Sequence, residues 1–183
     1  MVLKLYSDPR IFAGGGAIFV HVLAEKRIPF QHIPVSVADR QNTTPEYLAI
    51  QPFGQVPAID DDGFILYESR AICRYLAEKY QDQGTPLLPQ SLKERALFEQ
   101  AAFIELANFH PYCQTVNDEA FGKPRRGLLT DQTILASAIA LASGKLGVYE
   151  TILGKHRHQS TGARPCRNLP SQTSSVSCTR IFL

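Results

Sequence analysis

The stretch from Gln51 to Tyr80 constrains the fold of this 183-residue chain more than any other part of it. Two short apolar runs, Val56–Asp60 and Phe64–Tyr67, are separated by an Asp-Asp-Gly turn signal, which predicts a β-hairpin. Directly afterwards, Ser69–Tyr80 places apolar residues at helical spacing behind a serine that can cap the first turn. We expect this helix to close a first domain near residue 81.

The residues before the hairpin alternate between strand and helix patterns. Val2–Tyr6 and Ile33–Val37 have the composition of strands, and Gly14–Lys26 carries one apolar face at helical spacing. A short helix is expected over Pro45–Ile50. The expected order is therefore β-α-β-α-β-β-α, which describes an α/β domain over residues 1–81.

A second, helical domain is expected after a linker at residues 82–90, a stretch that contains one glycine and two prolines. Two long helices follow, from Ser91 to about Cys113 and from about Asp131 to Leu153, the first opened by a capping-box pattern. Their apolar residues at core spacing should point inward: Leu97, Ala101, Ile104 and Leu106, then Ile134, Leu135, Ile139, Leu146 and Ile152. Residues 91–154 thus predict the start of an all-α domain.

The composition changes after residue 154. Residues 155–183 carry five Lys or Arg and no Asp or Glu, among many Ser, Thr and Pro residues. A basic tail with so little apolar content is predicted to be disordered. Such a tail can bind nucleic acid, but it contains no interleaved aromatics and no known binding module. A solvated tail is favoured, and no nucleic-acid partner is expected.

The remaining composition favours a soluble protein in the cytoplasm. No apolar run is long enough to cross a membrane, and no targeting signal is visible, so no membrane partner is expected. The four cysteines lie far apart, without a CxxC pair and without a Cys/His set at zinc-ligand spacing. Reduced thiols and the absence of a metal site are therefore expected.

The residues that can carry chemistry lie at the start of the hairpin and at the start of the helix after it. Pro57 begins a strand, where a cis Val56-Pro57 bond would turn the backbone of Val56 outward to pair with an extended peptide. Ser69 offers amides, a hydroxyl and a helix dipole to a carboxylate, and Glu68 can hold an ammonium group. Together they fit the head of a free amino acid. Taken alone, Pro57 favours an ordinary proline turn, and simple helix capping explains Glu68 and Ser69 equally well.

The segment PFGQVPAIDDDGFILYESRAICRYLAEKY closely resembles the glutathione S-transferase family, and in particular its phi class from fungi and plants. The resemblance covers roughly residues 1–154 and is most specific over residues 51–80. It implies a thioredoxin-like N-terminal domain, an all-α C-terminal domain and, as is usual in the family, a homodimer. It also implies a detoxification enzyme that conjugates the thiol of its co-substrate glutathione to apolar electrophiles.

The resemblance assigns seven positions to glutathione binding: Gln55, Val56, Pro57, Glu68, Ser69, Asn42 and Thr43. Val56 would pair with the cysteinyl backbone, while Glu68 and Ser69 would clamp the γ-glutamyl group. The family's His-Lys pair for the glycine carboxylate aligns with Asn42 and Thr43, whose uncharged side chains can offer only hydrogen bonds. Weaker binding is therefore expected, by about 1–2 kcal/mol if one charge-assisted bond becomes neutral.

The catalytic hydroxyl or thiol that the family places at the start of the first helix has no match here. From Asp8 through Val35 there is no Ser, Thr, Tyr or Cys. Ser7, just past the first strand, could take this role if the following loop folds back. Arg10 could instead stabilise a thiolate electrostatically, and so could the bare amides of Gly14–Gly16. Ser7 is the candidate catalytic side chain.

Family members continue past the second long helix into a further buried helix, and nothing after Gly154 resembles it. The resemblance thus implies an incomplete C-terminal domain, with a truncated or frame-altered end and an uncovered apolar face. Three functions stay open. The chain is an enzyme that conjugates glutathione or reduces peroxides with it, a non-catalytic binder of glutathione or hydrophobic ligands, or a regulatory relative that acts through protein contacts.

Overall fold

The computed structural model describes residues 2–10 and 15–155 of the chain. The chain divides between Arg95 and Ala96, within helix α4 (Leu92–Asn108), into two compact units. The tail expected to be disordered, residues 155–183, lies outside the described residues apart from Lys155, and Gly14 lies outside them as well.

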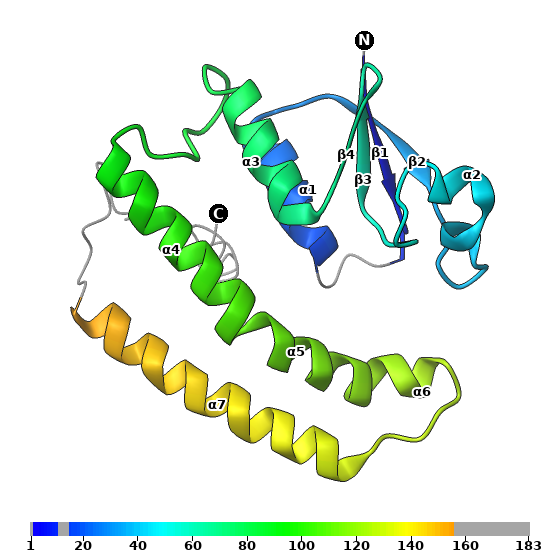
Figure 1. The fold of residues 1–183 in the computed structure, drawn as a ribbon, viewed down its shortest axis with the longest axis vertical. Coiled ribbons are helices and arrows are strands. Elements are labelled where there is room, and N and C mark those ends of the chain that lie inside the picture. Colours follow the sequence, from blue (N-terminus) through cyan, green and yellow to red (C-terminus); the bar gives the residue numbers. More distant parts are fainter. Residues whose placement is uncertain (1, 11–14, 156–183) are drawn as a thin grey trace, which may run out of the picture. The chain divides into compact units, whose positions relative to one another are not determined.

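The first unit is built on a four-stranded sheet in the order β2-β1-β3-β4. Its strands are β1 (Leu3–Ser7), β2 (Phe30–Pro34), β3 (Ala58–Asp61) and β4 (Phe64–Tyr67). Strand β1 runs parallel to β2 and antiparallel to β3, and β3 and β4 form the expected hairpin. Helices α1 (Gly15–Glu25) and α3 (Ser69–Lys79) contact each other on one side of the sheet, and α2 (Pro45–Leu48) lies beyond the other side (Figure 1). The expected β-α-β-α-β-β-α order and the thioredoxin-like class are confirmed.

Alternation along β1 and helical spacing along α1 and α3 create the core of this unit. Leu3 and Leu5 point into it, and they meet the apolar stripes of the two helices. The fully buried members contributed by the helices and by β3 are Phe19, Val22, Ile59, Ile72 and Leu76. Each such side chain stabilises the fold by about 1.5–3 kcal/mol, so α1 and α3 are fixed firmly against β1 and β3.

Strand β2 lies three residues earlier than the expected Ile33–Val37. The amides of Ser36 and Val37 do not join the sheet, because they donate to Gln41 Oε1 at 2.7 Å and to Asp8 Oδ2 at 2.8 Å. Strand β2 is also an edge strand whose residues are mostly exposed, so its sequence lacks the alternation that would have marked its bounds.

The expected serine cap of α3 is wrong as well. Ser69 is the first residue of the helix, and the capping position belongs to Glu68, whose side chain makes no hydrogen bond to the helix. Glu68 has a φ of 71°, which is uncommon for a residue with a side chain.

The second unit is helical, as expected, but its first long helix is interrupted. Helix α4 ends at Asn108, and α5 (His110–Asn117) follows after Phe109, whose ψ of −56° accompanies a non-helical φ of −123°. Pro111 explains the break, because proline lacks an amide hydrogen and is tolerated only in the first turn of a helix. A π-helical turn (Asp118–Gly122) and the short α6 (Lys123–Arg125) come next.

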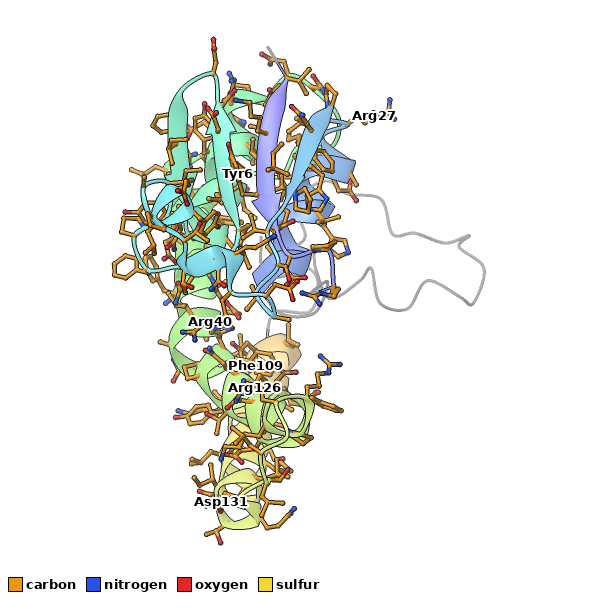
Figure 2. The ribbon with its side chains drawn as sticks, turned by 90° about the vertical axis from the view of Figure 1, so that its right-hand side faces the viewer. Tyr6, Arg27, Arg40, Phe109, Arg126 and Asp131 are labelled. Carbon is orange, nitrogen blue, oxygen red and sulfur yellow. The ribbon has the colours of Figure 1, made fainter. Side chains whose placement is uncertain are left out.

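Helix α7 (Gln132–Lys155) is the longest element of the chain's described part and runs two residues beyond its expected end at Leu153. Asp131 caps it, accepting hydrogen bonds from the amides of Thr133 at 2.9 Å and Ile134 at 3.0 Å, and it stands at the start of the helix in Figure 2. Helices α5 and α7 pack along each other.

The expected inward faces of the second unit are mostly wrong. Leu97 is 63% exposed, Leu106 39%, and Ile139 48%, and Ile134 and Leu146 are also exposed. Leu97 and Leu106 belong to α4 and the other three to α7, and both helices carry apolar residues on several sides, so a partner can cover only part of each apolar surface. Within the described residues of this unit, Ala102, Ala138 and Glu119 are the buried ones.

Two further observations concern membranes and metals. Among the helices that are described, none is both long and apolar enough to traverse a bilayer. Across residues 2–10 and 15–155, no group of three or more His, Cys, Asp or Glu side chains could share a metal ion.

Candidate functional site

Three strand ends lie side by side at one edge of the sheet in the first unit. Ala58 pairs with Tyr6 of β1 and with Tyr67 of β4. Ser7, Pro57 and Glu68 are the next residues along their strands, so they are neighbours at this edge. Adjacent strands are about 4.8 Å apart, which places Ser7 and Glu68 about 10 Å from each other. The edge thus brings Pro57 and Glu68, two of the expected ligand-binding positions, together with Ser7, the candidate catalytic residue.

The Val56-Pro57 peptide bond is cis, as expected from the sequence. Pro57 is buried and Val56 is half-buried, so the turn is fixed by the proline ring. Gln55, one residue earlier, leaves its side chain exposed.

Two buried side chains that the sequence analysis missed hold the backbone of this turn. Tyr47 of α2 donates its hydroxyl hydrogen to the carbonyl oxygen of Gln55 at 2.7 Å, and the Gln55 amide donates to Gln51 Oε1 at 3.2 Å. Burial raises the pKa of Tyr47 to about 12, so its hydroxyl remains a donor at any ordinary pH. Their shared partner Gln55 lies eight positions from Tyr47 and four from Gln51, and no sequence motif marks these contacts.

Glu68 and Ser69, the residues expected to bind the amino-acid head, lie at the start of α3. Glu68 is exposed, and its positive φ is the kind of backbone strain, about 1–3 kcal/mol, that clusters at functional sites. Its carbonyl accepts from the Ile72 amide at 2.9 Å and so belongs to the helix. Ser69, half-buried, opens the helix at the positive end of the dipole, where backbone amides have no partner within the helix itself. This pair can receive an ammonium group and a carboxylate at the same time.

Ser7, the candidate catalytic residue, ends β1 and contacts His32 of β2. His32 Nε2 lies 3.0 Å from Ser7 Oγ and 3.1 Å from the carbonyl oxygen of Ser7. His32 is exposed and Ser7 is half-buried. No sequence pattern links residues 25 positions apart, and only the parallel register of β1 and β2 brings them together.

Arg10, the alternative source of positive charge, is held by other groups. Its amide and its Nε donate to Asp8 Oδ1 at 2.8 and 3.3 Å, and its guanidinium also bonds the Ser36 hydroxyl. Burial raises the pKa of the Asp8 carboxyl, but the hydrogen bonds from the Arg10 and Val37 amides and from the guanidinium outweigh it and lower that pKa. The charge of Arg10 is therefore balanced by a carboxylate that stays ionised.

Asn42 and Thr43 lie in a 3₁₀ turn (Gln41–Thr43) next to the loop before Gln55. Asn42 Nδ2 donates to the carbonyl oxygen of Gly54 at 2.6 Å, and Thr43 Oγ1 donates to that of Arg40 at 2.8 Å. Gly54 has a φ of +62°, and a Cβ there would lie 2.9 Å from the Asn42 carbonyl oxygen, so the two loops are closely joined. Both side chains thus already bond local backbone.

Known proteins resemble this chain in both sequence and fold. The family model for the N-terminal domain of glutathione S-transferases matches residues 20–79, which include all seven positions assigned to glutathione binding. Glutathione S-transferase hmp2 of Hypomyces subiculosus is 42% identical over 161 residues, which cover 86% of this chain and 74% of that protein.

Solved structures give the same result. A serine-to-cysteine mutant of poplar glutathione transferase F1 matches with a TM-score of 0.80 at 29% identity, over 89% of this chain and 74% of that one. Glutathione S-transferase I from maize, in complex with an atrazine glutathione conjugate, matches with a TM-score of 0.74 at 28% identity, over 86% of this chain and 72% of that one. Since sequence and fold agree over nearly three quarters of these proteins, the chain belongs to the glutathione S-transferase family, a family of transferases, and is phi-like within it.

Proposed function

We propose that this protein binds glutathione at the sheet edge formed by Ser7, Val56–Pro57 and Glu68–Ser69, and joins its thiol to apolar electrophiles. The observation that carries the proposal is the cross-strand pair of Ala58 and Tyr67, which sets the cis proline beside the start of α3. A peptide-binding backbone and a binding site for an amino-acid head are thereby adjacent.

Each part of the tripeptide has a matching group. The γ-glutamyl ammonium pairs with the Glu68 carboxylate, and the γ-glutamyl carboxylate binds the Ser69 hydroxyl and the amides at the start of α3. The cysteinyl unit pairs with the amide and carbonyl of Val56 in the manner of an added strand, and the exposed Gln55 side chain lies next to it. These contacts orient the ligand with its sulfur toward β1.

The glycine end is the weak part of the proposed site. Asn42 and Thr43 already donate side-chain hydrogens to the carbonyl oxygens of Gly54 and Arg40. At most, the second hydrogen on Asn42 Nδ2 remains to bind a carboxylate. A neutral hydrogen bond contributes less than a charge-assisted one, by about 1–2 kcal/mol. We therefore expect glutathione to bind less tightly here than at a site with a His-Lys pair.

Ser7 is proposed to activate the thiol. A free thiol has a pKa near 8.5, so only a few per cent of it is ionised at pH 7. A hydroxyl that donates to the sulfur stabilises the thiolate and lowers that pKa, as does the positive end of α1, which begins at the same edge as Ser7. The thiol proton leaves to solvent, and the thiolate sulfur bonds to the electrophilic carbon, which releases its leaving group, chloride in the case of chlorodinitrobenzene.

Transferase activity is supported by the relatives of this chain, which are themselves named glutathione S-transferases. The maize protein whose structure contains an atrazine glutathione conjugate has the same fold over 86% of this chain. Detoxification, a homodimer and a cytoplasmic location are proposed on the same resemblance. So are the domain limits 1–81 and 91–154, joined by the linker 82–90 and followed by a tail.

The test is calorimetric titration of the full chain with reduced glutathione, followed by an assay of conjugation to chlorodinitrobenzene. Glu68→Gln should weaken glutathione binding about tenfold, equivalent to about 1.4 kcal/mol, because one charge pair is lost. Asp62→Asn is the matched control, since Asp62 is exposed, has a φ of 57° and lies at the other end of the same hairpin.

The two measurements separate the parts of the proposal. Failure to bind glutathione, or equal affinities for the wild-type chain and Glu68→Gln, would overturn the proposed site. Binding without conjugation would overturn the transferase activity and leave a glutathione binder.

A further inference from the structure

His32 makes an unusual double contact with one residue. Its Nε2 atom lies 3.0 Å from Ser7 Oγ and 3.1 Å from the carbonyl oxygen of the same serine. The two residues lie on the same face of the sheet, because His32 pairs with Leu5 and Ser7 is two positions further along β1. The contact is therefore fixed by the β1–β2 register.

The carbonyl oxygen determines which way the hydrogen bonds run. A carbonyl can only accept, so the 3.1 Å contact is a hydrogen bond only when Nε2 of His32 carries the hydrogen. With the hydrogen on Nε2, both contacts run from the ring to Ser7, and the hydroxyl oxygen accepts one of them. A hydroxyl has a single hydrogen. Because it is not used on His32, Ser7 can donate it to a different acceptor.

The proposed acceptor position lies at the same edge of the sheet. A helix that connects two parallel strands runs back along the sheet, so α1 starts where β1 ends. The edge that holds Ser7 therefore also receives the positive end of α1, and both favour an anion. Arg10 adds little positive charge, because its guanidinium bonds Asp8 and Ser36.

From this geometry we infer that His32 is a positioning residue for the thiolate: its Nε2 hydrogen holds Ser7 so that the serine hydroxyl donates to the sulfur of glutathione. The inference rests on the proposed function. The thiol loses its own proton to water, Ser7 keeps its hydroxyl hydrogen, and His32 transfers no proton. The Ser7–His32 pair thereby supplies the donor that is missing between Asp8 and Val35.

The test measures the pKa of bound glutathione from the ultraviolet absorbance of its thiolate, using the full chain. In the wild type this pKa should lie below the free value of about 8.5. His32→Leu should raise the pKa of the bound thiol about as much as Ser7→Ala does. The double variant should raise this pKa no further, because each single change already disables the Ser7–His32 pair. His32→Gln, whose amide nitrogen can also donate to both oxygens, should restore most of the shift.

Gln31→Leu is the matched control, because Gln31 is an exposed neighbour on β2 whose side chain points to the other face of the sheet. It should leave the thiol pKa unchanged. Glutathione affinity is measured in every variant and should stay nearly constant, since His32 is proposed to act on the thiol and not on the grip at Glu68 and Ser69.

The possible results are distinguishable. If His32→Leu keeps the low thiol pKa while Ser7→Ala raises it, Ser7 acts unaided and the inference is wrong, although the proposed function stands. If glutathione binds with an unshifted pKa in the wild type, the inference is also wrong and the binding site survives. If glutathione does not bind at all, the proposed function fails and the inference fails with it.

Discussion

Asp61 is an acidic residue of the hairpin turn signal that the fold uses as a buried anchor. It is 9% exposed, accepts a hydrogen bond from the Tyr75 hydroxyl at 2.5 Å, and pairs with the ammonium group of Lys79. Both partners lie on α3, so the carboxylate ties the hairpin to the helix whose start forms part of the proposed glutathione site. Its neighbour Asp62 is exposed.

Asp61 should make stability depend on pH in the acid range. Burial raises the pKa of this carboxyl, but the hydrogen bonds from Lys79 and Tyr75 outweigh it and hold the pKa below its usual value. Such a group stabilises the fold above its unfolded pKa of about 3.9, and this stabilisation is lost as the pH falls through the folded pKa. Urea melts should therefore show that the free energy of unfolding falls less between pH 7 and pH 3 in Asp61→Asn than in the wild type. At pH 7, Asp61→Asn should be about 1–3 kcal/mol less stable than the wild type.

Asp62→Asn is the control for this measurement and should keep the wild-type pH profile. Parallel profiles for Asp61→Asn and the wild type would contradict the role assigned to the buried carboxylate.

At the scale of residues, the sequence predicts what depends on neighbours along the chain. The cis bond at Pro57 and the placement of Glu68 and Ser69 follow from short motifs. Tyr47 and His32 could not be assigned in the same way, because their partners are 8 and 25 positions away and are reached only through the loop and strand geometry.

At the scale of elements, the segment after α3 is fastened to the end of α1. Thr85 bonds Glu25 twice, from its amide to the carbonyl at 3.0 Å and from its hydroxyl to the carboxylate at 2.5 Å. Gln83 Nε2 donates to the carbonyl oxygen of Lys26 at 2.6 Å, and Lys26 is 1% exposed. Gly84 lies between these contacts with a φ of +63°. The first residues of the expected linker are thus packed onto the first unit.

Gly84→Ala should be strongly destabilising. A Cβ there would lie 2.2 Å from the Glu25 carbonyl oxygen, so backbone would have to move, and the positive φ adds about 1–2 kcal/mol for a residue with a side chain. Gly63→Ala isolates the conformational part, because Gly63 has a φ of +88° but nothing within 4 Å of the added carbon. Chemical denaturation should give a loss for Gly84→Ala that clearly exceeds the loss for Gly63→Ala. Equal losses would mean that the close approach to Glu25 has no energetic weight.

Element boundaries followed the sequence where turn chemistry is explicit. Phe64–Tyr67 was predicted to the residue, because the preceding turn and the following helix start mark both of its ends. Strand β2 was misplaced, because the side chains of Asp8 and Gln41 capture the amides of the residues that looked most strand-like. Pro111 could have signalled the α4–α5 break, but the apolar pattern continues across it.

At the scale of the whole molecule, the two units differ in how much they bury. The first unit has a core that joins helices α1 and α3 to strands β1 and β3. The second, in its described part, buries Ala102, Ala138 and the Glu119 carboxylate, which accepts from Lys123 at 2.5 Å and from the Asp131 amide at 2.9 Å. Small buried areas stabilise a unit weakly.

Hydrogen exchange should reveal this difference. Amides of α7 should exchange faster than those of β1, β3 and α3, because local opening costs less where fewer apolar contacts are broken. Mass spectrometry of exchanged and digested protein at neutral pH measures both units in one experiment, with the first unit as the internal reference. Protection of α7 equal to that of β3 would show that the second unit is stabilised as well as the first.

Fold class and element order were predictable because periodicity and turn signals are local, whereas burial in the second unit was not. Leu97 and Ile139 have core-type spacing, yet spacing specifies only that a face exists and not that a partner covers it.

The register that sets Ala58 between Tyr6 and Tyr67 has an evolutionary consequence. In the site proposed above, the residues assigned to ligand affinity lie in one stretch, 42–69, whereas the residues assigned to reactivity, Ser7 and His32, lie outside it. Substitutions can therefore accumulate in either set while selection preserves the other. A lineage with this sheet edge can lose its chemistry and remain a glutathione receptor, or regain chemistry through one hydroxyl on a strand that already ends beside the ligand.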